Sequence, residues 1–215
     1  MRFDIRLSSA LLGVLLLGGC AISRSVLDIP SPNTEKISQS HGKEVYINST
    51  VDKRIFETAP SSPNTPSLDP NADQSDTVKR RAVGRKRNTF GKALGDILLK
   101  EGQTVETLTS ASIRQAFMEK GYRVVTSKDE TRSNTYIVDA DIEKFWSWTN
   151  PGFAAITLST EISASLSIKS PEGTSRQAIA VKASDHYQTG MEENWIEVIN
   201  KALRAFIDDV KAKLN

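Results

Sequence analysis

The clearest pattern in the chain is an alternation of apolar and polar residues on both sides of the segment TNPG, residues 149–152. Side chains along a strand point alternately to opposite faces, so the pattern predicts a long antiparallel hairpin with one apolar face. Because the apolar positions are even-numbered in both strands, paired residue numbers must have an even sum, as in Trp146 opposite Ile156. The apolar positions are Tyr136, Val138, Ala140, Ile142, Trp146 and Trp148, then Ile156, Leu158, Ile162, Ala164, Leu166 and Ile168.

Shorter patterns predict further strands and two helices. Period-two alternation indicates a half-buried strand over residues 44–52, and residues 96–99, 122–126 and 177–187 are also expected to be extended. Apolar residues at helical spacing predict a helix over residues 105–119, capped by Thr104. A second helix covers residues 195–214, with a capping box formed by Thr189 and Glu192. The predicted fold is therefore α+β: a largely antiparallel sheet with a long hairpin, covered on one face by two helices.

A polar segment, TAPSSPNTPSLDPNADQSDT, separates the first strand from the rest of the pattern. Its proline, serine, asparagine and aspartate residues bury too little apolar area to offset the entropy of ordering. We therefore expect a disordered insertion at about residues 58–77, within a single α+β domain over residues 43–215.

The first twenty residues carry a different kind of signal. Arg2 and Arg6 precede an apolar run of about ten residues, whereas a helix needs about 20 to cross a membrane. A basic start, a short apolar run and small residues at its end are typical of a secretory signal peptide. Residues 1–19 are expected to be that peptide.

The only cysteine of the chain follows this run directly. Leu17, Gly18, Gly19 and Cys20 resemble the lipobox of bacterial lipoproteins. The resemblance implies that a signal peptidase recognises the first three residues, and that Cys20 carries the acyl chains that anchor the protein. Ala21, where an Asp would favour the inner membrane, implies the periplasmic face of the outer membrane of a Gram-negative cell. Residues 20–42 are then the lipidated cysteine and a flexible tether; an inert cysteine after an ordinary signal is the alternative.

Charge changes this picture little. The net charge is +2, which gives no overall field for nucleic acid. One run, KRRAVGRKR, is a candidate patch for anionic partners such as phospholipid headgroups or an acidic protein surface. We favour the alternative, a solvated basic loop balanced by acidic residues elsewhere. The cations of the run are Lys79, Arg80, Arg81, Arg85, Lys86 and Arg87.

The residues that catalysis and metal binding require are scarce. There are two histidines and one cysteine, and no GxSxG, Walker, GxGxxG or HExxH motif occurs. Asp139, Asp141 and Glu143 share the polar face of a strand, which spreads them apart, so we interpret them as solvent-facing. Asp185 and His186 are adjacent and point to opposite faces of a strand. We therefore expect no enzyme activity, no metal and no cofactor.

Aromatic residues gather at the tip of the predicted hairpin. Phe145 falls on the otherwise polar face, and Trp148 and Phe153 lie close to it in the sequence. An exposed aromatic tip would dock a partner or enter a membrane interface. The favoured alternative is that the tryptophans close the end of the core under the last helix.

Taken along its length, the sequence resembles the YajG family of bacterial lipoproteins. The resemblance rests on Cys20, VDKR at residues 51–54, VGRKRN at 83–88, EKGY at 119–122, the hairpin and the final helix. It implies an envelope lipoprotein with no accepted active site. Asp52 and Arg54, within VDKR, are expected to form a structural ion pair worth at most about 1 kcal/mol if exposed.

The expected function is that of a non-enzymatic binding or structural module of the cell envelope. Its expected partners are the membrane, through the acyl chains on Cys20, and an envelope protein or lipid, with no nucleic acid. The alternative is an accessory subunit of an envelope transport or assembly complex, which handles lipid or stabilises the complex.

Overall fold

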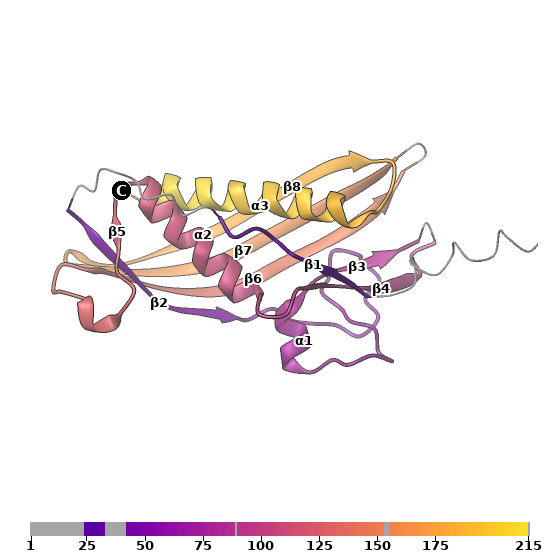
Figure 1. Cartoon of the computed structure of the whole chain (residues 1–215), viewed down its shortest axis with the longest axis horizontal. Helices are drawn as coiled ribbons and strands as arrows, with labels where there is room; N and C mark the ends of the chain where they lie inside the picture. Colours follow the sequence, from indigo (N-terminus) through magenta and orange to yellow (C-terminus); the bar gives the residue numbers. More distant parts are fainter. Residues whose placement is uncertain (1–23, 33–41, 89, 153–154, 215) are drawn as a thin grey trace, which may run out of the picture.

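The computed structural model describes residues 24–32, 42–88, 90–152 and 155–214 of the chain. Within these ranges one twisted eight-stranded sheet carries two long helices, α2 and α3 (Figure 1). The elements are β1 (Ser25–Leu27), β2 (Glu44–Asp52), α1 (Asp76–Arg81), β3 (Ala82–Arg87), β4 (Ala93–Leu99), α2 (Val105–Glu119), β5 (Arg123–Val124), the 3₁₀ helix η2 (Lys128–Glu130), β6 (Tyr136–Pro151), β7 (Ile156–Ser170), β8 (Gly173–Tyr187) and α3 (Glu192–Lys213).

Strand β6 is the centre of the sheet because it pairs with three other strands, β2, β3 and β7. One edge pairs antiparallel with β7, which in turn pairs antiparallel with β8. The other edge pairs in parallel with β2 and, further along, with β3 at Gly84 and Ser147. The pairs β1–β4 and β2–β5 are parallel, and β3–β4 is antiparallel. The α+β class is therefore as expected. The antiparallel prediction is confirmed in part, because the long pairings β6–β7 and β7–β8 are antiparallel, while parallel pairings make the sheet mixed.

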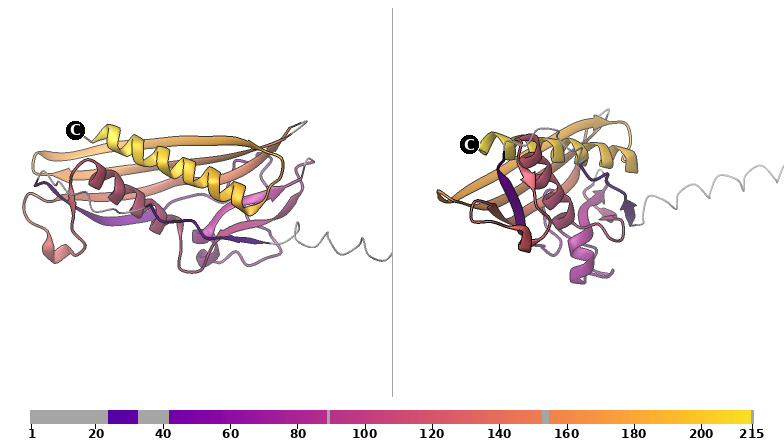
Figure 2. Two further views of the ribbon diagram at one scale, coloured as in Figure 1. Left: turned by 45° about the horizontal axis from the view of Figure 1, so that its top comes forward. Right: turned by 60° about the vertical axis from the view of Figure 1, so that its left-hand side comes forward.

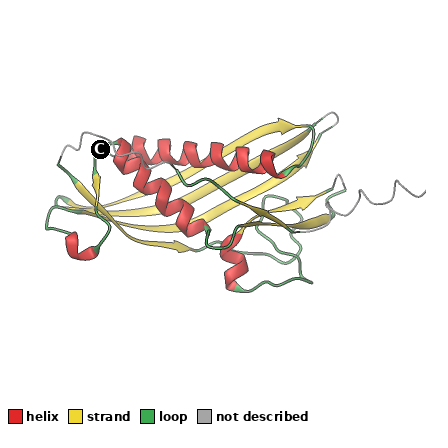
Figure 3. Cartoon of the chain, viewed as in Figure 1, coloured by secondary structure: helices red, strands yellow, loops and turns green. Residues whose placement is uncertain are grey.

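Helices α2 and α3 lie against one face of the sheet, α2 over β2 and α3 over β7 and β8 (Figures 2 and 3). The predicted cap of α2 is confirmed: Thr104 Oγ1 accepts a hydrogen bond from Thr107 N at 3.2 Å. The predicted capping box of α3 is wrong. That helix begins after Met191, which makes no side-chain capping bond within the described chain, and Thr189 instead accepts from Asn194 Nδ2 at 2.8 Å.

A β-bulge at Glu143 divides β6 into two halves with opposite facing. Ile142 pairs with Ala164, but Lys144 pairs with Ser163, so Glu143 is one extra residue. The even-sum register therefore holds before the bulge and is wrong after it, where Trp146 pairs with Glu161. Beyond the bulge it is the odd-numbered side chains that face α3.

The reversed half of β6 carries a second, smaller core on the face away from α2 and α3. Trp146 donates its Nε1–H to Pro63 O at 3.2 Å, and the ring of Phe56 stands edge-on to it at 6.0 Å. The expectation of a disordered insertion over residues 58–77 is therefore wrong. The polar segment is ordered because it packs over the two tryptophans on this face. The composition of the segment alone does not show that such an apolar surface exists. The members of this core are Leu68, Val78, Ala82, Leu98, Trp146 and Trp148.

The N-terminal described segment, residues 24–32, belongs to the body. Strand β1 pairs with β4, and Leu27 and Ile29 are buried in the main core. The side chain of Gln103 bonds both the N–H and the carbonyl of Ile29, at 3.1 and 2.7 Å. The expected tether is therefore wrong over residues 24–32, and the rest of 20–42 up to residue 41 lies outside the described residues. No helix in the described ranges is long and apolar enough to cross a membrane.

Candidate functional site

The predicted lipidation motif, Leu17, Gly18, Gly19 and Cys20, lies outside the described residues, and so does Phe153. The other aromatic residues of the predicted tip are described and do not form an exposed tip. Phe145 is fully buried in the main core, because the bulge turns it toward α3. Trp148 is buried in the second core, with Lys182 Nζ 5.1 Å from its ring centre. The docking tip is therefore wrong for these two residues.

The basic run does not form one surface patch. Its first half lies in α1 and its second half in β3. Arg80 pairs with Glu106, and Arg81 Nε donates to Leu99 O at 2.9 Å. Arg85 is buried, donating to Leu68 O at 2.9 Å with its Nε 3.5 Å from Asp96 Oδ1.

The remaining cations of the run, Lys79, Lys86 and Arg87, are only partly buried. The predicted six-residue patch is thus wrong as a unit, and Lys86 and Arg87 lie together near the end of β3.

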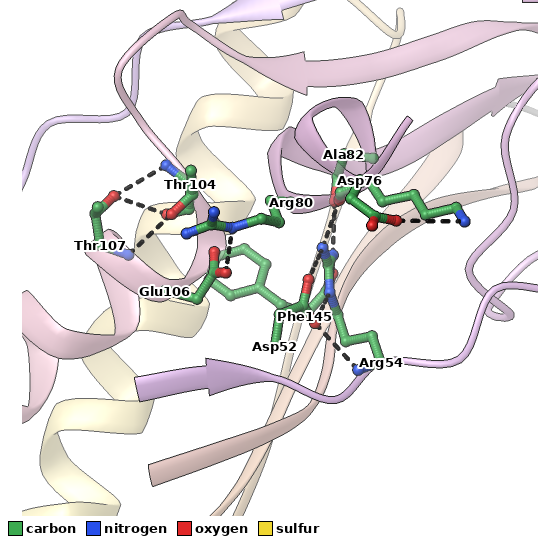
Figure 4. A network of polar contacts seen from close by, with 10 residues as sticks. Asp52, Arg54, Asp76, Arg80, Ala82, Thr104, Glu106, Thr107 and Phe145 are labelled. Carbon is green, nitrogen blue, oxygen red and sulfur yellow. Dashed lines mark hydrogen bonds and ion pairs between the residues drawn. The ribbon is translucent and has the colours of Figure 1, made fainter. Parts of the chain in front are cut away.

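Arg54 is the centre of a buried polar network (Figure 4). Its Nε and Nη2 each donate to Asp52, at 2.8 Å, and Nη1 donates to Ala82 O and Phe145 O at 2.6 and 2.9 Å. Nη2 also donates to Lys79 O at 2.7 Å. All five guanidinium N–H groups therefore have acceptors.

The expected ion pair of Asp52 and Arg54 is present, but it is buried and joins β2, α1, β3 and β6. It holds structure together and leaves no donor for a ligand.

The polar residues singled out for chemistry make ordinary structural contacts. Asp139 accepts from Asn48 Nδ2 at 2.7 Å and from Ser49 Oγ. Asp185 pairs with Lys201 at 2.6 Å, and His186 Nδ1 lies 3.0 Å from Thr157 Oγ1. Within the described ranges, no group of three or more His, Cys, Asp or Glu residues is placed to hold a metal ion.

A pocket of about 680 Å³ lies at the end of the body where β1 begins, and we call it the end pocket. It is bounded by the ends of β3, β4, β6 and β7 and by the first turn of α3, at the right-hand end of Figure 1. Its size is in the usual range for a small-molecule site, about 300–1,000 Å³. The end pocket is lined by Ser25, Lys86, Arg87, Asn88, Leu94, Thr149, Pro151, Ile156, Gln188, Thr189, Gly190, Met191, Glu192 and Trp195.

The local sequence explains why this space stays open. Gly190 has no side chain, and Trp195 donates its Nε1–H to the Gly190 carbonyl at 3.2 Å, which holds the indole against the wall. A Cβ on Gly190 would touch Ile156 Cδ1 at 3.6 Å, so a larger side chain at this position would occupy the space beside this wall residue. Met191, 58% exposed, lies at the start of α3.

The charged residues of the end pocket are two cations and one carboxylate, Lys86, Arg87 and Glu192. Burial, together with the nearby Arg85, lowers the pKa of Arg87. Arg87 Nη1 donates to Gly91 O at 3.0 Å, while its Nε is buried without a hydrogen-bond partner in the described chain. This wall of the pocket therefore holds a partly desolvated positive charge.

Sequence reasoning found Lys86 and Arg87 but not the pocket they border. The apolar wall comes from four separate stretches of chain, and only the tertiary fold brings Leu94, Ile156 and Trp195 together. One local signal was available: Met191 stands at an N-cap, where Ser, Thr, Asp or Asn is usual.

No known family model and no curated protein sequence matches this chain. Among solved structures it is similar to an uncharacterised protein, with TM-score 0.48 and 8% identity over 90% of this chain and 99% of that one. It is also similar to protein XCC0632 of Xanthomonas campestris, described as DUF330, with TM-score 0.44 and 13% identity over 89% and 94%.

A third similar structure is the hypothetical protein CT253 of Chlamydia trachomatis, with TM-score 0.34 and 9% identity over 80% and 99%. At these scores and identities the similarities carry no argument about function. The Xanthomonas and Chlamydia neighbours are uncharacterised bacterial proteins.

Proposed function

We propose that the protein is a lipoprotein anchored to the periplasmic face of the outer membrane, in the manner of the YajG family, and that its body is a non-enzymatic binding module. The observation that carries this proposal is the place of Ser25, which both begins β1 and lines the end pocket. Cys20 precedes Arg24 by four residues, and four residues span at most about 14 Å. Acyl chains on Cys20 would therefore hold the end pocket close to the membrane surface.

The exposed side chains at this end also support an orientation in which the end pocket faces the membrane. Phe90, 93% exposed, follows Asn88 of the pocket wall by two residues, and Met191 lies at its rim. Two large apolar side chains exposed at the same end of the body suit a membrane interface. Lys86 and Arg87 on the same end would face the anionic surface of a bilayer.

Labelling in a Gram-negative host tests the anchor. Cells that express the full chain are fed an alkyne analogue of palmitate, and the protein is recovered from separated inner and outer membranes. We expect label on the natural chain, in the outer membrane, and no label on Cys20→Ser. Ala21→Ser is the matched control, since it introduces a serine at the next position and keeps the thiol of Cys20. Lipidation of Cys20 would be contradicted by label on Cys20→Ser, or by a natural chain without label.

A second candidate function is an accessory subunit of an envelope transport or assembly complex, which handles lipid. The end pocket favours it, since a purely structural anchor needs no cavity. Large side chains of the main core, such as Phe117, Phe145 and Phe206, are fully buried, and the end pocket has an apolar wall, so we place the lipid site there.

A further inference from the structure

We propose that the end pocket holds one acyl chain of a membrane phospholipid, with the phosphate of that lipid against Lys86 and Arg87. The inference rests on the proposed function, because it takes the lipid from the membrane to which Cys20 anchors the body. It adds to that function a ligand class and the residues that recognise it.

The apolar part of the end pocket fits a hydrocarbon chain. Its large apolar side chains are those of Leu94, Pro151, Ile156, Met191 and Trp195. The indole N–H of Trp195 donates to the carbonyl of Gly190, so it needs no acceptor from a ligand. A chain without polar atoms therefore loses no hydrogen bond when it displaces water from this wall.

The charged part of the end pocket fits a phosphate. Lys86 and Arg87 outnumber Glu192, the one acidic residue among the described residues of the wall. Arg87 has Arg85 as a charged neighbour, and the pKa of Arg87 is lowered, so an anion beside it relieves an unfavourable charge. The buried Nε–H of Arg87 is a further donor with no acceptor in the described chain.

The position of the pocket decides the source of the ligand. Ser25 lies in the pocket wall and is five residues from Cys20, a distance of at most about 18 Å. A lipid that leaves the bilayer thus has only a short path to the pocket. A free fatty acid or a soluble metabolite would not require the pocket to lie close to the membrane.

The test uses the full chain with Cys20→Ser, secreted and purified without detergent, so that no anchor contributes to binding. The probes are vesicles that contain phosphatidylglycerol with a fluorescent acyl chain, and matched vesicles that contain a diacylglycerol with the same chains. We expect the protein to extract the phospholipid, with the diacylglycerol bound about tenfold more weakly because the charged hydrogen bonds to phosphate are lost.

Two variants keep the test falsifiable. Gly190→Leu fills the space beside Ile156 and should weaken phospholipid binding by about tenfold or more. Met191→Glu places a charge at an exposed rim position, where folding is not at risk, and should act in the same direction. Equal binding by the parent and by both folded variants would overturn the proposal.

Charge is tested separately. Lys86→Gln with Arg87→Gln should remove the preference for phospholipid over diacylglycerol, while Lys53→Gln, exposed and outside the pocket wall, should keep it. An unchanged preference in the double variant would exclude these residues as the phosphate site.

The lipidated natural chain separates the two sources of an acyl chain. If Cys20→Ser extracts lipid and the lipidated chain does not, the pocket is filled by the chain on Cys20 itself, and the membrane source is overturned. If Cys20 is labelled but no lipid is extracted, the lipid-binding proposal is wrong and the anchor stands. If lipid is extracted but Cys20 is not labelled, the lipid-binding proposal stands and the anchor is wrong.

Discussion

Arg54 and Asp52 form a two-pronged ion pair, with Nε–Oδ1 and Nη2–Oδ2 both at 2.8 Å, in which the guanidinium is fully buried. Removing one partner of a buried pair leaves an uncompensated charge, so Arg54→Ala should cost about 3–5 kcal/mol of unfolding free energy in urea. Arg54→Lys should also destabilise, because a lysine cannot reproduce five donors in one plane. Lys53→Ala, exposed next to it, is the control, with an effect within about 0.5 kcal/mol. A cost for Arg54→Ala no larger than this would contradict the role of the network.

Gly84 is where β3 approaches β6 most closely. A Cβ there would lie 2.8 Å from the carbonyl oxygen of Ser147, which is backbone and cannot move aside. We expect Gly84→Ala to destabilise by about 1–3 kcal/mol in thermal unfolding, since β3 must shift away from β6. Gly190→Ala, whose Cβ would have ordinary contacts, should change stability little. Equal melting temperatures for the two variants would count against this packing.

Leu68 tests whether the segment at residues 58–75 belongs to the folded body. It is 5% exposed and packs in the second core with Trp146 and Trp148. Leu68→Ala should therefore cost about 2–5 kcal/mol and make the segment sensitive to limited proteolysis. If the segment were a mobile loop, neither stability nor cleavage would change.

Glu119 links α2 to α3 through ion pairs. Arg204 donates to both of its carboxylate oxygens, at 2.6 and 2.7 Å, and Lys211 donates to Oε2 at 2.6 Å. The hydrogen bonds from Arg204, and then those from Lys211 and Gln115, outweigh burial and hold the pKa of Glu119 well below its usual value.

A lowered folded-state pKa gives stability that is present above the ordinary value of about 4.5 and is lost as the pH falls below it. Glu119→Gln should therefore reduce the free energy of unfolding at pH 7 and flatten its decline below about pH 4.5. Urea unfolding across this range measures the slope. The exposed Glu101→Gln is a charge-matched control, and an equal slope in Glu119→Gln and the natural chain would refute this role of Glu119.

Phe90 tests the proposed orientation of the body, with the end pocket toward the membrane. In the Cys20→Ser background, Phe90→Ser should lower the fraction that sediments with phosphatidylglycerol vesicles, because an exposed aromatic ring no longer enters the interface. Ile55→Ser is the matched control: Ile55 is 79% exposed and lies outside the end pocket. A similar loss for both variants would show that the effect is general hydrophobicity and not orientation.

Much of the fold could be predicted from local pattern, because most elements bury one regular face. The helix cap at Thr104, the strand β2 and the stripe along α3 follow directly from residue spacing. The facing of Phe145 could not be predicted, since Trp146 and Trp148 continue the even-numbered apolar positions and so hide the extra residue of the bulge. The apolar residues at Trp146 and Trp148 fit a one-faced strand equally well.

The candidate site was predictable only in part. Lys86 and Arg87 are conspicuous in the sequence, whereas their apolar partners come from strands and a helix whose meeting depends on the whole sheet. The ordered segment at residues 58–75 was missed for the opposite reason. Its own residues are polar, and what orders it is an apolar surface that other strands provide.

The pairing of β1 with β4 also sets an order of events. Arg24 and Asp96, which bond at 3.2 Å across these strands, are 72 residues apart in the chain. In a chain that emerges N-terminus first, β1 has no partner until β4 has appeared, and closing so long a loop is a late step in folding. The outer edge of the sheet at β1 is therefore closed by a segment that is delivered long before the strand it pairs with.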